Sequence, residues 1–364
     1  MTSQSFSATA ADFSGHKDQA MASYRQAYRT GVLDPAITRS GILPLTQSMV
    51  DGQATKFLLE TEDGLELESV VLPIQSRSGR ERCTLCVSSQ IGCAMGCTFC
   101  ETAQMGRLRN CLPEEIIAQW YAATHFVGAT ITNIVFMGMG EPMDNFENVE
   151  AAIAILTDQN GPCIAPSRIT VSTVGHIKGM TRYTAMAQTP GMGRLGLAVS
   201  LNAPNDTIRS QIMPLNKANN MTALHAAMLH WLGEKRRLLI EYVVIPTVND
   251  QAAHAEEVAH YLSDLPRTTI NVIPYNPRRN SPWPACSDQA VSQFATWLSE
   301  QGSKVMVRRH RGRQLMAACG QLGNTPATAT APLDHPFLDP ALGSDQSHDQ
   351  SDPSPPDRYQ IHTG

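Results

Sequence analysis

Short apolar runs alternate with longer stretches of helical periodicity over most of this chain. The apolar, strand-like runs fall at residues 84–88, 131–137, 168–173, 195–201, 239–245, 270–274 and 304–308. The helix-like stretches between them fall at residues 113–126, 148–157, 177–187, 222–234, 251–263 and 288–300. Regular alternation of strands and helices predicts a parallel sheet with helical crossovers, either a barrel, open or closed, or a doubly wound sheet.

The chain before residue 83 follows a different pattern. Residues 1–48 are mixed and polar with one helical stretch, so we expect a helical N-terminal extension. Two strand-like runs follow, and the Asp63-Gly64 pair between them is a hairpin signal. We therefore expect a small β element over residues 49–82 and the main α/β domain over residues 83–324.

Negative charge is concentrated at the C-terminal end. The formal net charge is −5, yet the residues before 334 hold 27 basic and 27 acidic side chains, whereas residues 334–364 hold six Asp and one Arg. Residues 325–364 are rich in Thr, Ala, Pro and Ser, which predicts a disordered acidic tail. Because local basic patches decide nucleic-acid contact, the overall charge does not exclude an RNA partner.

Several classes of protein are disfavoured. No apolar run reaches the length of about 18 residues that a membrane span needs, and the polar N-terminus does not resemble a secretory signal. The nine cysteines, three of them within eight residues, indicate metal binding or catalysis rather than a disulfide scaffold. We expect a cytoplasmic protein that does not associate with membranes.

Cys93, Cys97 and Cys100 form a C-x3-C-x2-C motif directly after the strand predicted at residues 84–88. Three closely spaced thiolates can hold three irons of a [4Fe–4S] cluster and leave the fourth iron open for a cofactor. An alternative uses the pairs Cys83/Cys86 and Cys97/Cys100 as a four-cysteine zinc site, which would make the protein a binding module. That alternative leaves Cys93 without a role.

Polar motifs follow several of the predicted strands at their carboxyl ends. In α/β barrels the chemistry lies at this edge, where the loops after the strands converge. The glycines of the first motif allow the backbone to approach a ligand closely. The residues at this edge are Gly138–Pro142, Ser172, Ser200–Asn202 and Asn276.

Longer sequence motifs in the chain resemble those of one known enzyme family. CVSSQIGCAMGCTFCETAQMG, FMGMGEP, LAVSLNAPNDTIRSQIMPLNK, IEYVVIPTVND, VIPYNP and AACGQL are similar to the RlmN/Cfr family of radical S-adenosylmethionine (SAM) enzymes, which methylate adenine in RNA. The likeness runs from about Glu68 to Leu322. It implies a partial (β/α)6 barrel, a [4Fe–4S] cluster held by the three motif cysteines, and SAM as cofactor. The implied SAM contacts are Gly140, Glu141, Ser172, Ser200, Leu201, Asn202 and Asn276.

The resemblance also implies a catalytic route, because an adenine ring carbon is not nucleophilic. Cys319 would accept a methyl group from one SAM, and a second SAM would supply the radical that takes a hydrogen atom from it. Cys86 would then attack the Cys319 sulfur, forming a disulfide and releasing the methylated base. Glu68 would take the proton from the ring carbon. The product would be methylated at C2 in preference to C8.

The family resemblance further implies partners. Ribosomal or transfer RNA would be the substrate, flavodoxin or ferredoxin the electron donor, and the enzyme a monomer. Basic clusters that could contact RNA include Arg107/Arg109, Arg278/Arg279 and the arginines from Arg308 onward. The chain departs from the family at Asn202, where His is common. A radical SAM enzyme acting on a peptide or small molecule is the other enzymatic hypothesis, but it leaves Cys319 and Cys86 without a role.

Overall fold

The computed structural model describes residues 17–32, 42–75, 81–233, 235–308 and 320–323. The predicted acidic tail, residues 325–364, lies outside the described residues, as does Cys319. In the described part of the chain no helix is both long and apolar enough to cross a bilayer.

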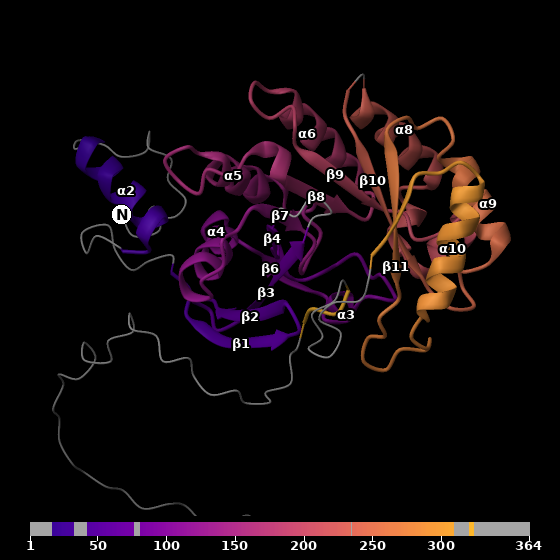
Figure 1. The fold of residues 1–364 in the computed structure, drawn as a ribbon, viewed down its shortest axis with the longest axis horizontal. Coiled ribbons are helices and arrows are strands. Elements are labelled where there is room, and N and C mark those ends of the chain that lie inside the picture. The colour runs from indigo at the N-terminus through magenta and orange to yellow at the C-terminus, as the bar shows by residue number, and fades with distance from the viewer. Residues whose placement is uncertain (1–16, 33–41, 76–80, 234, 309–319, 324–364) are drawn as a thin grey trace, which may run out of the picture. The chain divides into compact units, whose positions relative to one another are not determined.

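One mixed sheet of ten strands organises the described residues (Figure 1). The strands lie side by side in sequence order, with only β5 and β6 outside the sheet. They are β1 (Leu45–Asp51), β2 (Ala54–Glu60), β3 (Glu66–Gln75), β4 (Glu81–Cys86), β7 (Asn133–Phe136), β8 (Ile169–Thr173), β9 (Gly196–Ser200), β10 (Leu238–Val244), β11 (Thr268–Pro274) and β12 (Val305–Val307).

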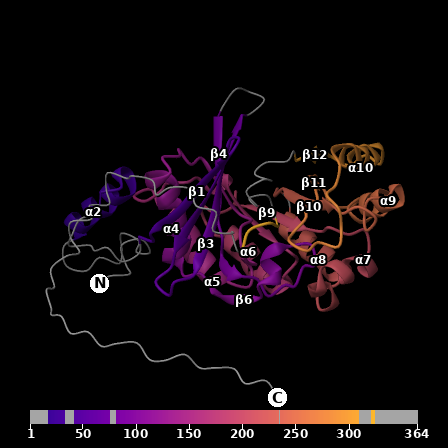
Figure 2. The same cartoon turned by 90° about the horizontal axis from the view of Figure 1, so that it is seen from below.

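Within this sheet, β4 and β7 to β12 are parallel to one another, which confirms the predicted parallel sheet. Strands β1 to β3 pair antiparallel, and β3 joins them to β4. Among the described residues β1 and β12 each have one neighbour, so the sheet is open rather than a closed barrel. The β1–β3 element and β12 stand on opposite sides of the view in Figure 2.

Helices connect the parallel strands and follow one another around the outside of the sheet (Figure 1). They are α4 (Pro113–Tyr121), which continues as a π-helical turn (Ala122–Phe126), α5 (Phe146–Thr157), α6 (Ile177–Gln188), α7 (Asp206–Ile212), α8 (Met221–Leu232), α9 (Ala252–Tyr261) and α10 (Asp288–Glu300). All but α7, which was not predicted from the sequence, match the predicted stretches closely. An N-terminal helix, α2 (Lys17–Thr30), precedes the sheet.

The helix starts follow from local chemistry. Pro113 opens α4, and the acidic side chain of Glu115 accepts from the Leu112 backbone N–H at 2.8 Å. Asn205 and Asn220 cap α7 and α8 by accepting from backbone N–H groups three residues on. Each cap satisfies donors that the first helical turn cannot pair internally.

Aromatic stacking fixes the outer helices against each other and against the sheet. Tyr183 of α6 and Trp231 of α8 stack with ring centroids 5.2 Å apart. Tyr242 of β10 stacks on Phe294 of α10 at 4.9 Å. All four side chains are fully buried. The inner face of the sheet is thereby left for polar side chains at the carboxyl ends of the strands.

Candidate functional site

A cleft lies at the carboxyl ends of the parallel strands, on the inner face of the sheet. It brings together nearly all the predicted cofactor residues from five separate loops. Those that line it are Cys93, Cys97, Cys100, Gly140, Glu141, Ser172, Ser200, Asn202 and Asn276. Leu201 is buried beside them but is not part of the lining.

The cysteine loop is built on a small two-stranded ribbon. Strand β5 (Gln90–Gly92) pairs antiparallel with β6 (Arg107–Asn110), and the short helix α3 (Glu101–Gln104) lies between them in sequence. The Cys93 backbone N–H donates to the Gly106 carbonyl at 2.9 Å. Gly92 has a φ of +76°, and a Cβ there would overlap the Gly106 oxygen. A residue other than glycine would therefore push the first thiol out of place.

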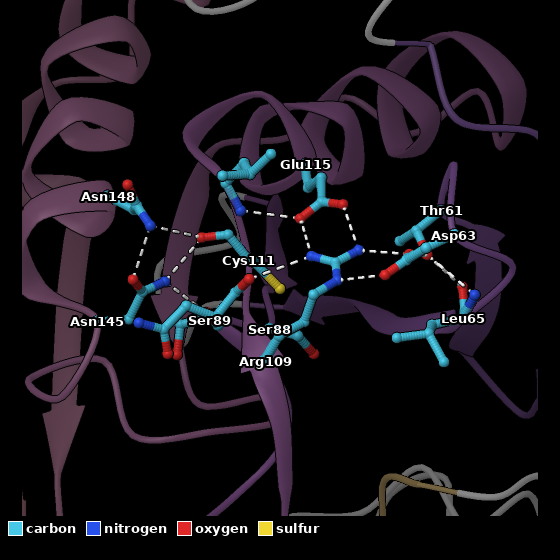
Figure 3. Close-up of polar contacts among 12 residues, drawn as sticks. Thr61, Asp63, Leu65, Ser88, Ser89, Arg109, Cys111, Glu115, Asn145 and Asn148 are labelled. Atoms are coloured by element: carbon cyan, nitrogen blue, oxygen red, sulfur yellow. Dashed lines mark hydrogen bonds and ion pairs between the residues drawn. The ribbon is translucent and has the colours of Figure 1, made fainter.

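Arg109 ties this ribbon to its surroundings (Figure 3). Its guanidinium forms bidentate pairs with Asp63 (2.7 Å) and with Glu115 (2.8 Å). Asp63 is in the β2–β3 turn and Glu115 in the first turn of α4. On the other side, Asn145 Nδ2 donates to the backbone carbonyls of Ser89 (2.7 Å) and Cys111 (2.8 Å). The ribbon that carries the cysteines is thus held from both sides.

The protein by itself disfavours the thiolate form of the three motif cysteines. Burial raises the pKa of Cys93 to about 12, and it also raises those of Cys97 and Cys100. Neighbouring thiols raise the pKa values of Cys93 and Cys97 further, because one thiolate disfavours another. An iron–sulfur cluster reverses this preference, since bound metal stabilises thiolates. The residues present therefore fit a cluster.

The described residues include no group of three or more His, Cys, Asp or Glu side chains placed to hold a single metal ion. This finding gives no support to the four-cysteine zinc alternative. Cys83 and Cys86 lie on β4, paired with Pro73 and Val70 of β3, and neither lines the cleft. A cubane does not require its thiolates to meet at a single metal ion, because each thiolate bonds a different iron.

Glu141 is a buried acceptor at the edge of the cleft. Its carboxylate accepts from the backbone N–H groups of Met143 (3.0 Å) and Val174 (2.8 Å). Burial raises the pKa of Glu141 to about 7, against the lowering effect of these donors. Gly140 before it has a φ of +96°, and a Cβ there would lie 2.5 Å from the Gln90 side chain. This arrangement suits a ligand that brings its own positive charge, such as an ammonium group.

Asn202 joins two strand ends at the cleft. Its φ is +56°, a left-handed conformation that Asn tolerates better than most residues. Its Oδ1 accepts from the Val243 N–H at 2.9 Å, and its carbonyl accepts from Asn249 at 2.7 Å. The amide therefore locks the loop after β9 to β10, so that Ser200 and Asn202 both face the cleft.

Glu68 and Cys86 share one face of the sheet. In the β3–β4 register Val70 opposes Cys86, and Glu68 lies two residues from Val70, so the three side chains point to the same side. In the parallel part of the sheet Cys86 pairs with Val135, and Val135 pairs with Thr170, so these side chains lie on the same face. Ser172 lies two residues after Thr170 on β8 and therefore also points to this face. Glu68 and Cys86 are thus on the cleft side of the sheet, although neither lines the cleft itself.

Glu68 is fully buried and paired. Its carboxylate lies 2.8 Å from Lys56 Nζ, and both side chains are within 1% of complete burial. It also accepts from the Gly323 backbone N–H at 2.8 Å. Residues 320–323 follow Cys319 in sequence, and their other contacts include Glu101 N to the Gly320 carbonyl at 2.7 Å. Gly320 and Leu322 line the cleft.

Two residues at the site, Glu241 and Arg209, were not predicted from the sequence. Glu241 lines the cleft at 5% exposure, and its Oε2 has no hydrogen-bond partner within the described residues, although Arg308 lies 3.8 Å away. Arg209 lies behind the cleft. The signal for Glu241 was an acid inside an apolar strand, LLIEYVV, which is unusual for a buried strand.

Two of the predicted basic residues already have partners within the protein. The two carboxylates bound to Arg109 satisfy its guanidinium, and Arg107 pairs with Asp144 at 2.6 Å. Arg278 donates to the Thr98 carbonyl at 2.7 Å, beside the cysteine loop, and Arg308 lines the cleft. Contact of these clusters with RNA stays a prediction.

Comparison with known proteins gives one consistent result. A model of the Radical SAM superfamily matches residues 87–260. The chain is 41% identical over 304 residues to the probable dual-specificity RNA methyltransferase RlmN 1 of Protochlamydia amoebophila (strain UWE25), over 83% of this chain and 82% of that protein. It is 37% identical over 296 residues to the dual-specificity RNA methyltransferase RlmN of Desulfotalea psychrophila (strain LSv54 / DSM 12343), over 78% of each chain.

A solved structure agrees with the fold. The crystal structure of a radical SAM methyltransferase from Sphaerobacter thermophilus superposes with a TM-score of 0.76 at 36% identity, over 84% of this chain and 92% of that one.

Proposed function

Since this chain belongs to the RlmN family of radical SAM RNA methyltransferases, which use a [4Fe–4S] cluster and SAM, we propose that it methylates an adenine ring carbon, C2 in preference to C8. The RNA would be ribosomal or transfer RNA. The single observation that carries the proposal is the cleft: the three thiols of the motif, the Glu141 carboxylate and Gly320, which follows Cys319, line the same space.

The cleft supports separate roles for its cysteines and for Glu141. Cys93, Cys97 and Cys100 would hold the cluster, which with SAM supplies a radical that takes a hydrogen atom. The buried Glu141 carboxylate would bind the amino group of SAM, because it accepts two backbone N–H bonds and still faces the cleft. The remaining SAM contacts would come from Gly140, Ser172, Ser200, Leu201, Asn202 and Asn276.

Glu68, Cys86 and Cys319 would carry the later steps. Cys319 would bear the methyl group, and the Cys86 thiolate would attack its sulfur to release the base as a disulfide forms. Two facts support this. Glu68 and Cys86 share a sheet face, and the chain just after Cys319 donates to Glu68 at 2.8 Å. As the base, Glu68 would first have to exchange one of these contacts for the substrate.

Two further proposals follow from the family alone. The electron that starts each turnover would come from a small donor protein, a flavodoxin or a ferredoxin. The enzyme would act as a monomer.

The roles of the two cysteines can be tested by what each variant traps. Cys86→Ala, purified from cells, should carry RNA covalently bound at Cys319, because no thiolate remains to release it. Cys319→Ala should carry no RNA and no methyl group at this peptide, yet keep its iron. Mass spectrometry of the peptide that contains Cys319, with and without nuclease, reads out both. Cys286→Ala, a buried cysteine away from the cleft, is the matched control.

Normal turnover by Cys86→Ala would refute the assigned roles even if the cluster assignment held. Nucleoside analysis of RNA from cells with and without the gene would then identify the modified carbon and the RNA class.

A further inference from the structure

Arg209 is a buried cation with only neutral hydrogen-bond partners among the described residues. It lies on α7 and has an exposed fraction of 0%. Its guanidinium donates to the backbone carbonyls of Leu201 (3.1 Å), Val174 (2.6 Å) and Ser200 (3.1 Å), and to Asn216 Oδ1 (2.8 Å). None of the ion pairs within the described part of the chain includes it.

The acidic groups nearest to Arg209 do not neutralise it directly. Asp206 is reached only through Asn216, whose amide donates to the Asp206 carboxylate at 2.7 Å. Tyr261 donates its hydroxyl hydrogen to the Met221 carbonyl at 2.6 Å and so stays neutral. Burial lowers the pKa of Arg209, which reflects the cost of holding this charge away from water. A buried charge without a counter-charge is expensive, so a negative ligand is expected close by.

The segment that carries Arg209 packs directly against the cysteine loop. The Thr98 backbone N–H donates to the carbonyl of Ile212, the last residue of α7, at 2.9 Å. A Cβ on Gly96 would lie 3.5 Å from Pro214 in the turn that follows. Thr98 and Gly96 flank Cys97 in the sequence, so the segment that carries Arg209 packs against the loop on both sides of this cysteine. A negative group bound at Cys97 would therefore lie on the side of the cleft that Arg209 supports.

We propose that Arg209 is a positioning residue that compensates the negative charge of the cluster at Cys97 and thereby favours its reduced state. The inference rests on the proposed ligation by Cys93, Cys97 and Cys100. Thiolates make the bound cluster negative and reduction adds an electron, so a nearby fixed cation stabilises the reduced form more than the oxidised form. The same guanidinium holds the carboxyl ends of β8 and β9, the strands that carry Ser172 and Ser200.

The test compares a neutral and a charged replacement in the full chain after anaerobic reconstitution. Arg209→Gln removes the charge, and Arg209→Lys keeps it while losing most of the carbonyl contacts. Arg236→Gln is the control, because Arg236 also donates to backbone carbonyls (Ala187, Trp231) but precedes β10, at the opposite end of the strands from the cleft. Iron content and the cluster's reduction potential, from a redox titration followed by electron paramagnetic resonance, are measured for each.

The potential should become more negative in Arg209→Gln and stay near the wild-type value in Arg209→Lys and Arg236→Gln. An unchanged potential in an iron-replete Arg209→Gln, or an equal shift in Gln and Lys variants, would overturn the proposal. If Arg209→Gln retains no iron, the Lys variant decides: its retention of the cluster supports a charge role, and its loss shows a purely structural one. Wild-type protein that binds no iron would instead refute the cysteine assignment itself.

Discussion

At the scale of single residues, burial alone does not separate a ligand cysteine from a structural one. Burial raises the pKa of Cys97 and of Cys111 alike. The two differ in what they face. Cys97 lines the cleft with two other thiols, whereas Cys111 packs in the core and offers its backbone carbonyl to Asn145 and Asn148. Only a group of converging thiols can hold a cluster.

This difference predicts a clear contrast in iron content. Anaerobically reconstituted wild-type protein should bind about four irons per chain. It should also absorb light at the violet end of the visible spectrum, as proteins with clusters of this class do. Replacement of Cys93, Cys97 or Cys100 by Ala should abolish that iron. Cys111→Ala, an equally buried control, should keep it. Full iron retention in the three motif variants would exclude them as ligands.

At the scale of elements, the cysteine ribbon depends on a cation shared between two other elements. Arg109 links β6 to the β2–β3 turn through Asp63 and to α4 through Glu115. The Arg109 guanidinium holds the pKa of Asp63 well below its usual range. The Asp63 carboxylate is half-exposed, so solvent screens its attraction to Arg109. The Glu115 side chain is nearly buried, so its ion pair with Arg109 is the stronger of the two.

Replacement of Arg109 should therefore cost more than replacement of its neighbour on the same strand. Arg109→Gln should lower the free energy of unfolding by about 1.5–3 kcal/mol, because charge-assisted bonds are lost and Glu115 loses its cation. Arg107→Gln, which breaks an exposed pair with Asp144, should cost less than about 1 kcal/mol. Urea denaturation monitored by circular dichroism gives both values. Equal costs would show that the bridging geometry adds nothing.

At the scale of the whole molecule, a four-residue segment joins the end of the described chain to the cleft. The Leu322 carbonyl accepts from Thr102 at 2.6 Å, and Gly323 donates to Glu68 at 2.8 Å. Gln321 donates to the Pro277 carbonyl at 3.1 Å. These contacts bridge β3, α3 and the loop after β11. They stop at Gly323, the last described residue.

The composition of residues 325–364 predicts that their removal changes little. Truncation after Asn324 should leave the melting temperature and the iron content unchanged, because this segment lacks the apolar residues that repay ordering. Truncation after Cys319, which also removes residues 320–323, should lower the melting temperature by several degrees. Differential scanning calorimetry compares the two. A similar drop in melting temperature after removal of residues 325–364 alone would show that this segment packs against the rest of the protein.

Local patterns determined much of this protein by themselves. Hydrophobic periodicity located the crossover helices, because each has an apolar face that must be buried. The spacing of Cys93, Cys97 and Cys100 indicated a cluster site, because their convergence depends on one short loop. The edge strand β1, with the sequence LTQSMVD, was missed because it lacks an apolar run. Strands β5 and β6 were missed because they are too short to show a period.

Only the tertiary structure decided which charges meet. Arg109 was predicted to be a candidate for RNA contact, yet Asp63, 46 residues earlier, occupies its guanidinium. Arg209 bonds to a carbonyl 35 residues away, at Val174. Lys56 meets Glu68 because the β2–β3 register sets Lys56 opposite Val70 on the same face. Strand register and crossover packing set these contacts, and both depend on the whole fold, whereas a periodic pattern reports only the burial of neighbouring residues.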